Sequence, residues 1–152
     1  TFSMLLNLVE TSNADSKELL WKFVKKYKPD IDEKKFSIFD GLVGYAIKYF
    51  NDVIKAQKKY KLPSENEKIA LKSLNMRLSK LNNSTDAEQI QSEVYETGKE
   101  FQYDELKEWF SALYQILLGQ MQGPRIGSFI AIYGCKETID LINRAIKGEL
   151  TN

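Results

Sequence analysis

Apolar side chains recur every three or four residues along most of the chain, and this spacing predicts amphipathic α-helices. The clearest stripe runs from Phe39 to Ile54, over about four helical turns, and a second runs from Leu106 to Leu118. No segment shows sustained alternation of apolar and polar residues, so we do not expect a β-sheet. The pattern predicts helices near residues 2–10, 16–27, 38–60, 65–81, 86–97, 105–118, 125–133 and 136–147.

Helix start and stop signals agree with these ranges. Three pairs have the spacing of a capping box, in which two residues satisfy each other's free backbone amides: Asp15 with Glu18, Ser64 with Glu67, and Thr85 with Glu88. Four glycines follow apolar stretches, where a left-handed residue ends a helix at little cost: Gly98, Gly119, Gly134 and Gly148. We expect an all-α protein, an irregular helical bundle or cage of about eight helices, which could form two subdomains, 1–82 and 83–152.

The composition excludes several chemistries. The 152 residues include no histidine and one cysteine, so the chain cannot form a Ser-His-Asp triad, a Cys-His nucleophile or a Cys/His zinc site. We therefore expect no catalytic residue and no metal site in it. No run reaches the roughly 18 apolar residues of a membrane span, and no basic segment marks a signal peptide, so a cytoplasmic protein without membrane contact is expected.

The near-neutral net charge of +1 conceals an uneven distribution. Residues 17–61 contain 12 lysines against six acidic residues, a net charge of +6, whereas residues 62–110 have a net charge of −4. A basic segment beside an acidic one suits a polyanion that touches part of the surface. Solvated helix faces explain the same lysines equally well.

A dense motif follows the second apolar stripe. Gly119 ends one helix, Gly123 permits a tight turn, and Pro124 starts the next helix, so that Arg125 and the free amides after it form an anion site. Gly127 inside that helix costs about 1 kcal/mol relative to Ala, which indicates a close approach to the backbone. The alternative is that Gly127 lets two helices pack closely while Arg125 pairs with a carboxylate.

Aromatic and cationic residues alternate in the basic segment. Trp21, Lys22 and Lys25 fall in one predicted helix, and Tyr49 and Asn51 fall in the next. Single-stranded RNA is held by such combinations, because unstacked bases lie on aromatic rings while lysines follow the phosphates. The alternative is that the rings belong to the helical core.

Four stretches resemble the C-terminal half of class I lysyl-tRNA synthetases: 2–8, 20–23, 40–46 and, most specifically, the Gly-Pro-Arg block at 117–129. The resemblance extends over essentially the whole chain. It implies a helical anticodon-binding region, comparable to the helical cage of glutamyl-tRNA synthetases, attached to an upstream Rossmann domain that uses ATP to join lysine to its tRNA. The His-Ile-Gly-His and Lys-Met-Ser-Lys-Ser signatures of that domain are missing, so these 152 residues are expected to be a non-catalytic fragment of the enzyme, without a cofactor of their own.

The resemblance implies two partners, the anticodon stem-loop of lysine tRNA and the enzyme's own catalytic domain. The uridines of that anticodon need hydrogen-bond donors and acceptors beside stacking surfaces. The candidate RNA-binding residues are Trp21, Lys22, Lys25, Tyr49, Asn51, Gly123, Arg125, Ser128 and Phe129. The alternative function is a helical scaffold that docks its lysine-rich face on another protein.

Overall fold

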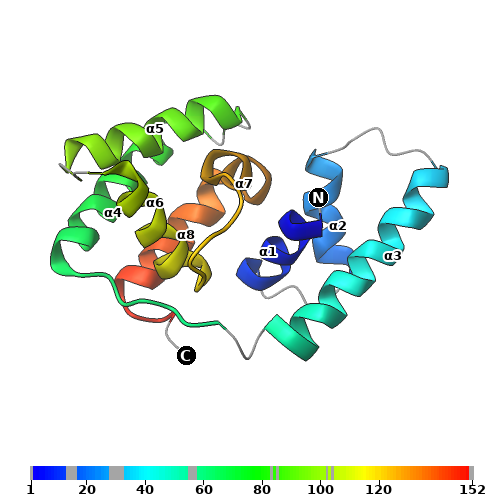
Figure 1. The fold of residues 1–152 in the computed structure, drawn as a ribbon. Coiled ribbons are helices and arrows are strands. Elements are labelled where there is room, and N and C mark those ends of the chain that lie inside the picture. The colour runs from blue at the N-terminus through cyan, green and yellow to red at the C-terminus, as the bar shows by residue number, and fades with distance from the viewer. Residues whose placement is uncertain are drawn as a thin grey trace. The chain divides into compact units, whose positions relative to one another are not determined.

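The computed structural model describes residues 2–12, 17–27, 33–54, 58–82, 84, 86–101, 103 and 105–150 (Figure 1). Every regular element in these ranges is helical and no strand occurs among them, so the all-α prediction is confirmed there. The chain divides into two compact units, Thr1–Lys58 (unit 1) and Lys59–Asn152 (unit 2). Each unit has its own apolar core, and we describe each by itself.

The described residues of unit 1 form four consecutive helical elements: α1 (Phe2–Ser12), α2 (Lys17–Tyr27), α3 (Glu33–Tyr49) and the π-helical turn η1 (Phe50–Ile54). Helix α3 packs against both α1 and α2, because its buried face carries small and branched apolar side chains at helical spacing. The fully buried side chains of this core are Leu8, Val9, Leu20, Val43 and Ala46.

Unit 2 is larger and contains α4 (Glu65–Ser79), α5 (Ala87–Glu100), α6 (Leu106–Leu113), the π-helical turn η3 (Tyr114–Leu118), α7 (Ile126–Tyr133) and α8 (Cys135–Ile146). Helix α5 packs against α4, α6 and α7, and α8 packs against α4, α7 and η3 (Figure 1). Trp109 is fully buried between α5 and α6, where its indole N–H donates to the Val94 carbonyl at 2.9 Å.

The predicted helix at 38–60 is wrong at both ends, because the structure starts it at Glu33 and ends it at Ile54. Residues 58–60 are not helical. Two backbone amides of this segment bond to η3 and its C-terminal neighbour instead: the Lys59 N–H donates to the Gly119 carbonyl at 3.1 Å, and the Lys61 N–H donates to the Gln115 carbonyl at 3.0 Å. These long-range bonds replace the helical ones that the apolar pattern suggested.

The capping predictions have three outcomes. The Ser64–Glu67 capping box is confirmed, with both of its reciprocal hydrogen bonds present at the start of α4. At the Thr85–Glu88 pair, Thr85 lies outside the described residues, and the N-cap of α5 is Asp86, whose carboxylate accepts from the Glu88 and Gln89 amides. Asp15 lies outside the described residues.

Three of the predicted glycine stops are confirmed by positive φ angles at the helix ends, at Gly119, Gly134 and Gly148. The predicted helix stop at Gly98 is wrong, because this residue lies inside α5. A Cβ at that position would sit 2.6 Å from the Trp109 ring, so close packing of the indole, and not helix termination, requires this glycine.

The boundary between the two units follows Lys58, whereas the sequence suggested a division between residues 82 and 83. That position lies inside unit 2, between α4 and α5, which pack on each other. Asn82 and Ser84 thus lie between two helices of the same unit. The division lies instead within the basic segment 17–61.

Candidate nucleic-acid interface

The segment 119–125, which we call the 119–125 loop, joins η3 to α7 on the surface of unit 2. Gly119 takes the left-handed conformation with φ of 68°, which turns the chain sharply at the end of η3. Its carbonyl accepts the Lys59 N–H, so the segment at 59–61 runs beside this end of η3. The Lys59 side chain is exposed there and places positive charge next to the start of the loop, whereas the Lys61 ammonium pairs with Glu67.

Two tyrosine rings hold the 119–125 loop in place. A Cβ at Gly119 would lie 3.3 Å from the Tyr60 ring, and one at Gly123 would lie 2.9 Å from the Tyr114 ring, so both glycines rest on aromatic surfaces. The Tyr114 hydroxyl donates to the Pro124 carbonyl at 2.7 Å, and burial raises the pKa of this phenol. Neither tyrosine was among the site residues predicted from the sequence, although Tyr114 lies three residues before the 117–129 block.

The tip of the 119–125 loop faces solvent. Met121 is 69% exposed, and Gln122 and Gly123 are exposed beside it. An amide side chain and free backbone groups supply both donors and acceptors, which are the groups that read the edges of unpaired bases. The loop therefore presents polar groups and an apolar thioether from a backbone that the tyrosines keep fixed.

Arg125 lies where the loop meets α7, and its guanidinium forms a bidentate ion pair with Glu88 of α5. The two N–O distances are 2.5 and 3.0 Å, and the guanidinium lowers the pKa of the Glu88 carboxyl. The Gly127 N–H donates to the Gln91 side chain at 2.7 Å. The predicted anion site at this helix start is thus filled by groups of α5, as in the alternative that the sequence left open.

Gly127 also marks the closest approach of α7 to α5. A Cβ there would collide with the Ala87 carbonyl oxygen and would lie 2.7 Å from the Gln91 Cβ. The requirement for glycine comes from helix packing. Two further candidates sit on α7: Ser128 is half-buried, whereas Phe129 is buried and stacks on Tyr133 with ring centroids 5.4 Å apart. Phe129 therefore lies in the core, although the sequence made it a candidate RNA-binding residue.

The remaining candidates lie in unit 1. Trp21 is buried and its indole N–H donates to Asp40 at 2.9 Å, so the ring belongs to the core and is not exposed to a base. Lys22 and Lys25 are exposed on α2, and Asn51 is exposed on η1. Tyr49 is half-buried and stacks on Tyr45, with ring centroids 6.2 Å apart. The lysines and Asn51 are thus accessible, and Trp21 is not.

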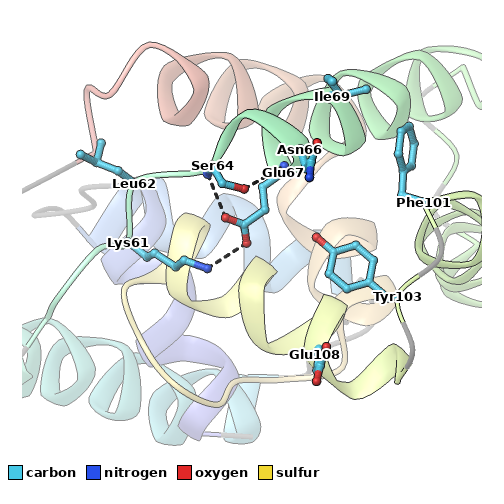
Figure 2. A pocket seen from close by; sticks show the side chains of 9 residues that line it. All are labelled: Lys61, Leu62, Ser64, Asn66, Glu67, Ile69, Phe101, Tyr103 and Glu108. Carbon is cyan, nitrogen blue, oxygen red and sulfur yellow. Dashed lines mark hydrogen bonds and ion pairs between the residues drawn. The ribbon is translucent and has the colours of Figure 1, made fainter.

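A hollow of about 680 Å³ lies elsewhere on unit 2, between the start of α4 and α6 (Figure 2). Its most buried polar group is the Glu67 carboxylate, which accepts from the Ser64 N–H and the Lys61 ammonium, each at 2.9 Å. Burial acts to raise the pKa of Glu67, but these hydrogen bonds outweigh it and the pKa is lowered.

Tyr103 lines the opposite wall of this hollow. Burial raises the pKa of its phenol, and the negative charges of Glu67 and Glu108 raise it further. Among the described residues that line the hollow, a phosphate backbone would meet two carboxylates and one exposed cation, Lys61. The electrostatics therefore favour the 119–125 loop over this hollow as a surface for RNA.

Comparison with known proteins decides the family. The family model described as "Anticodon binding domain" matches residues 20–146. The chain belongs to this anticodon-binding family. It is 44% identical to a lysine–tRNA ligase of Rickettsia felis over 93% of the chain and 27% of the relative, and 44% identical to that of Roseobacter denitrificans over 98% of the chain and 28% of the relative.

A third lysine–tRNA ligase, from Rickettsia peacockii, is 41% identical over 99% of the chain. The chain thus spans little more than a quarter of the length of these relatives. No solved structure matches it. Among the described residues of this family member, no helix is long and apolar enough to cross a membrane, and no cluster of three potential metal ligands occurs.

Proposed function

We propose that this chain is the C-terminal, anticodon-binding part of a class I lysine–tRNA ligase and that it holds the anticodon arm of a lysine tRNA. The family match and the identity to lysine–tRNA ligases support this assignment. In the full-length enzyme, an upstream Rossmann domain carries out the chemistry and uses ATP to join lysine to the tRNA in the cytoplasm. The 152 residues themselves bind RNA and hold no cofactor.

The observation that carries the proposal is the 119–125 loop. A recognition surface for an unpaired base must hold its donors and acceptors in place before the base arrives, because ordering them on binding costs affinity. Tyr60 and Tyr114 fix this loop from both sides, while Met121 and Gln122 stay exposed at its tip. An anticodon uridine can stack on the thioether and pair its edge with the amide and backbone groups.

Cations at the two ends of the loop contact the phosphates and base edges of the anticodon strand. Lys59 lies at one end of the loop and Arg125 at the other. The pairing of Arg125 with Glu88 does not prevent this role, because an exposed ion pair contributes little and a phosphate can replace the carboxylate. Ser128 supplies a hydroxyl on the first turn of α7.

Unit 1 contributes contacts that do not depend on sequence. Lys22 and Lys25 on α2 contact phosphates, and Asn51 and the edge of the Tyr49 ring are further RNA contacts of this unit. Such lysine contacts raise affinity for any RNA and weaken as salt is added. Discrimination between tRNAs comes from the 119–125 loop, and general affinity is shared between the units.

The experiment is competition binding. A fluorescent lysine anticodon stem-loop is bound to the chain and displaced by unlabelled hairpins with the same stem and different loops. We expect the lysine stem-loop to compete at a concentration at least tenfold lower than the unrelated hairpins. Equal competition by all hairpins, or no binding of any, would contradict anticodon reading and favour a scaffold that docks its lysine-rich face on an acidic protein.

A further inference from the structure

Helix α3 exposes apolar side chains on the face that flanks its buried one. Ile38 is 66% exposed, Leu42 is 38% exposed and Tyr45 is 58% exposed. These positions are four and three residues apart, so they form one stripe along the helix, which we call the α3 stripe. The buried face of the same helix already packs on α1 and α2, so the stripe is not needed for the core of unit 1.

Gly41 lies within the α3 stripe, three residues after Ile38 and four before Tyr45. A glycine inside a helix costs about 1 kcal/mol relative to alanine, so it calls for a physical reason. Packing gives that reason at Gly98 and Gly127, where a Cβ would collide with neighbouring atoms, but a Cβ at Gly41 would meet nothing within 4 Å. The glycine leaves a flat spot that allows close approach to the helix backbone from outside.

The composition of the α3 stripe favours a polypeptide over RNA. Isoleucine, leucine and a bare glycine offer no charge for a phosphate and no flat ring for a base. Tyr45 could stack on a base, but Tyr49 already covers part of it, since the two rings stack at 6.2 Å. A contiguous apolar strip around a glycine is typical of a surface that buries against another protein segment.

We propose that the α3 stripe docks against the catalytic part of the full-length ligase. The lysine–tRNA ligases of Rickettsia felis and Roseobacter denitrificans align with this chain over 27% and 28% of their own length. Nearly three quarters of each relative therefore lies outside the aligned region. A neighbouring segment of that size on the same polypeptide is present at high effective concentration, so a modest apolar strip suffices to hold it. Such docking would fix the distance between the anticodon surface and the site where lysine is attached.

This inference rests on the part of the proposed function that makes the chain a portion of a longer ligase, and it does not require that the 119–125 loop binds RNA. The test uses thiol labelling, because the native Cys135 is buried. Gly41→Cys places a thiol in the middle of the stripe without collision. Met76→Cys, on α4 of unit 2 at a site that is 62% exposed, is the matched control. Maleimide labelling at each position is followed by peptide-resolved mass spectrometry, in the 152-residue chain and in the full-length ligase.

We expect the Gly41→Cys thiol to react as fast as the control in the 152-residue chain and at least tenfold more slowly in the full-length ligase, independently of protein concentration. Equal rates in both proteins would overturn the proposal. Three other results would also overturn the proposal. Slow labelling already in the 152-residue chain would indicate a contact within the chain, and slowing that grows with protein concentration would indicate a second copy. Slowing only after lysine tRNA is added would indicate that RNA covers the stripe.

The binding assay separates this proposal from the proposed function. If the full-length ligase selects the lysine stem-loop and still leaves the Gly41→Cys thiol reactive, the docking proposal fails alone. If the thiol is protected while all hairpins compete equally, the anticodon proposal fails alone. The double variant Ile38→Ser, Leu42→Ser provides a second readout: it should restore labelling of the Gly41→Cys thiol in the full-length ligase at least fivefold, with an unchanged helical spectrum.

Discussion

Arg125 and Glu88 form a bidentate ion pair that joins the start of α7 to the first turn of α5. Both side chains are accessible to solvent, so the pair holds the guanidinium in place without burying it. In the proposed complex a phosphate or base replaces the carboxylate. The ion pair is then the arrangement of Arg125 in the absence of RNA. Arg125 strengthens RNA binding, whereas Glu88 competes with the RNA for the guanidinium.

Arg125→Ala is expected to weaken binding of the lysine anticodon stem-loop by roughly 5- to 150-fold, the range for an arginine that reads a base. Glu88→Gln is expected to leave affinity equal or higher, because it frees the guanidinium and removes a negative charge. Fluorescence anisotropy measures both, with Arg144→Ala, an exposed arginine on α8, as the control for loss of one positive charge. Equal losses of affinity for Arg125→Ala and Arg144→Ala would show that Arg125 is not part of the RNA interface.

Gly127→Ala and Gly41→Ala are expected to have opposite effects on the free energy of unfolding. At Gly127 the added methyl group collides with α5, and overpacking of this kind costs about 1 to 3 kcal/mol. At Gly41 the methyl group enters open space, so the gain in helix propensity stabilises the chain by about 0.4 to 1 kcal/mol. Urea denaturation followed by circular dichroism measures both, and a stabilising Gly127→Ala would refute the close packing of α5 on α7.

The Glu67 carboxylate is expected to contribute stability that depends on pH. Its pKa is lowered in the folded protein, so its contribution is complete above the unfolded value near 4.5 and is lost as the pH falls through the folded pKa. Glu67→Gln should therefore be less stable than the parent chain at pH 7, and the difference should shrink toward pH 3.5. Urea midpoints at several pH values test this, and a gap that stays constant would contradict the assigned pKa shift.

Unit 1 is expected to open more readily than unit 2. The smaller unit buries less of its surface, and a domain of about 60 residues is only marginally stable on that account. Amide hydrogen exchange should show lower opening free energies in α2 and α3 than in α5 and α8. The exchange rates of the α4 amides test the boundary between the units. If α4 opens together with α5, the boundary lies after Lys58, whereas opening together with α3 would support the division at residue 82.

The sequence predicted features that depend on local spacing. The helical periods, the Ser64–Glu67 box and the glycine at Gly119 involve residues within a few positions of each other, and the structure confirms them. Predictions failed where distant residues compete for the same groups. The helix expected to reach residue 60 ends early, in a region where the backbone at 59–61 bonds to Gln115 of η3 and to Gly119.

The site was only partly predictable for the same reason. The Gly-Pro-Arg block indicated the 119–125 loop, but nothing local pairs Arg125 with Glu88 or brings Tyr60 to Gly119. The apolar periodicity could not show that Trp21 and Phe129 are buried, because an aromatic ring in an amphipathic helix can lie in the core or at a binding surface. Packing between elements determines both outcomes.

The most direct test of the account is chemical-shift mapping of the isotopically labelled chain with a lysine anticodon stem-loop. We expect the largest shifts at the amides of residues 119–123 and of Lys59, with much smaller shifts at the same amides for a hairpin with an unrelated loop. Large shifts elsewhere, for example around Glu67 and Tyr103, with none in the 119–125 loop would contradict the proposed site.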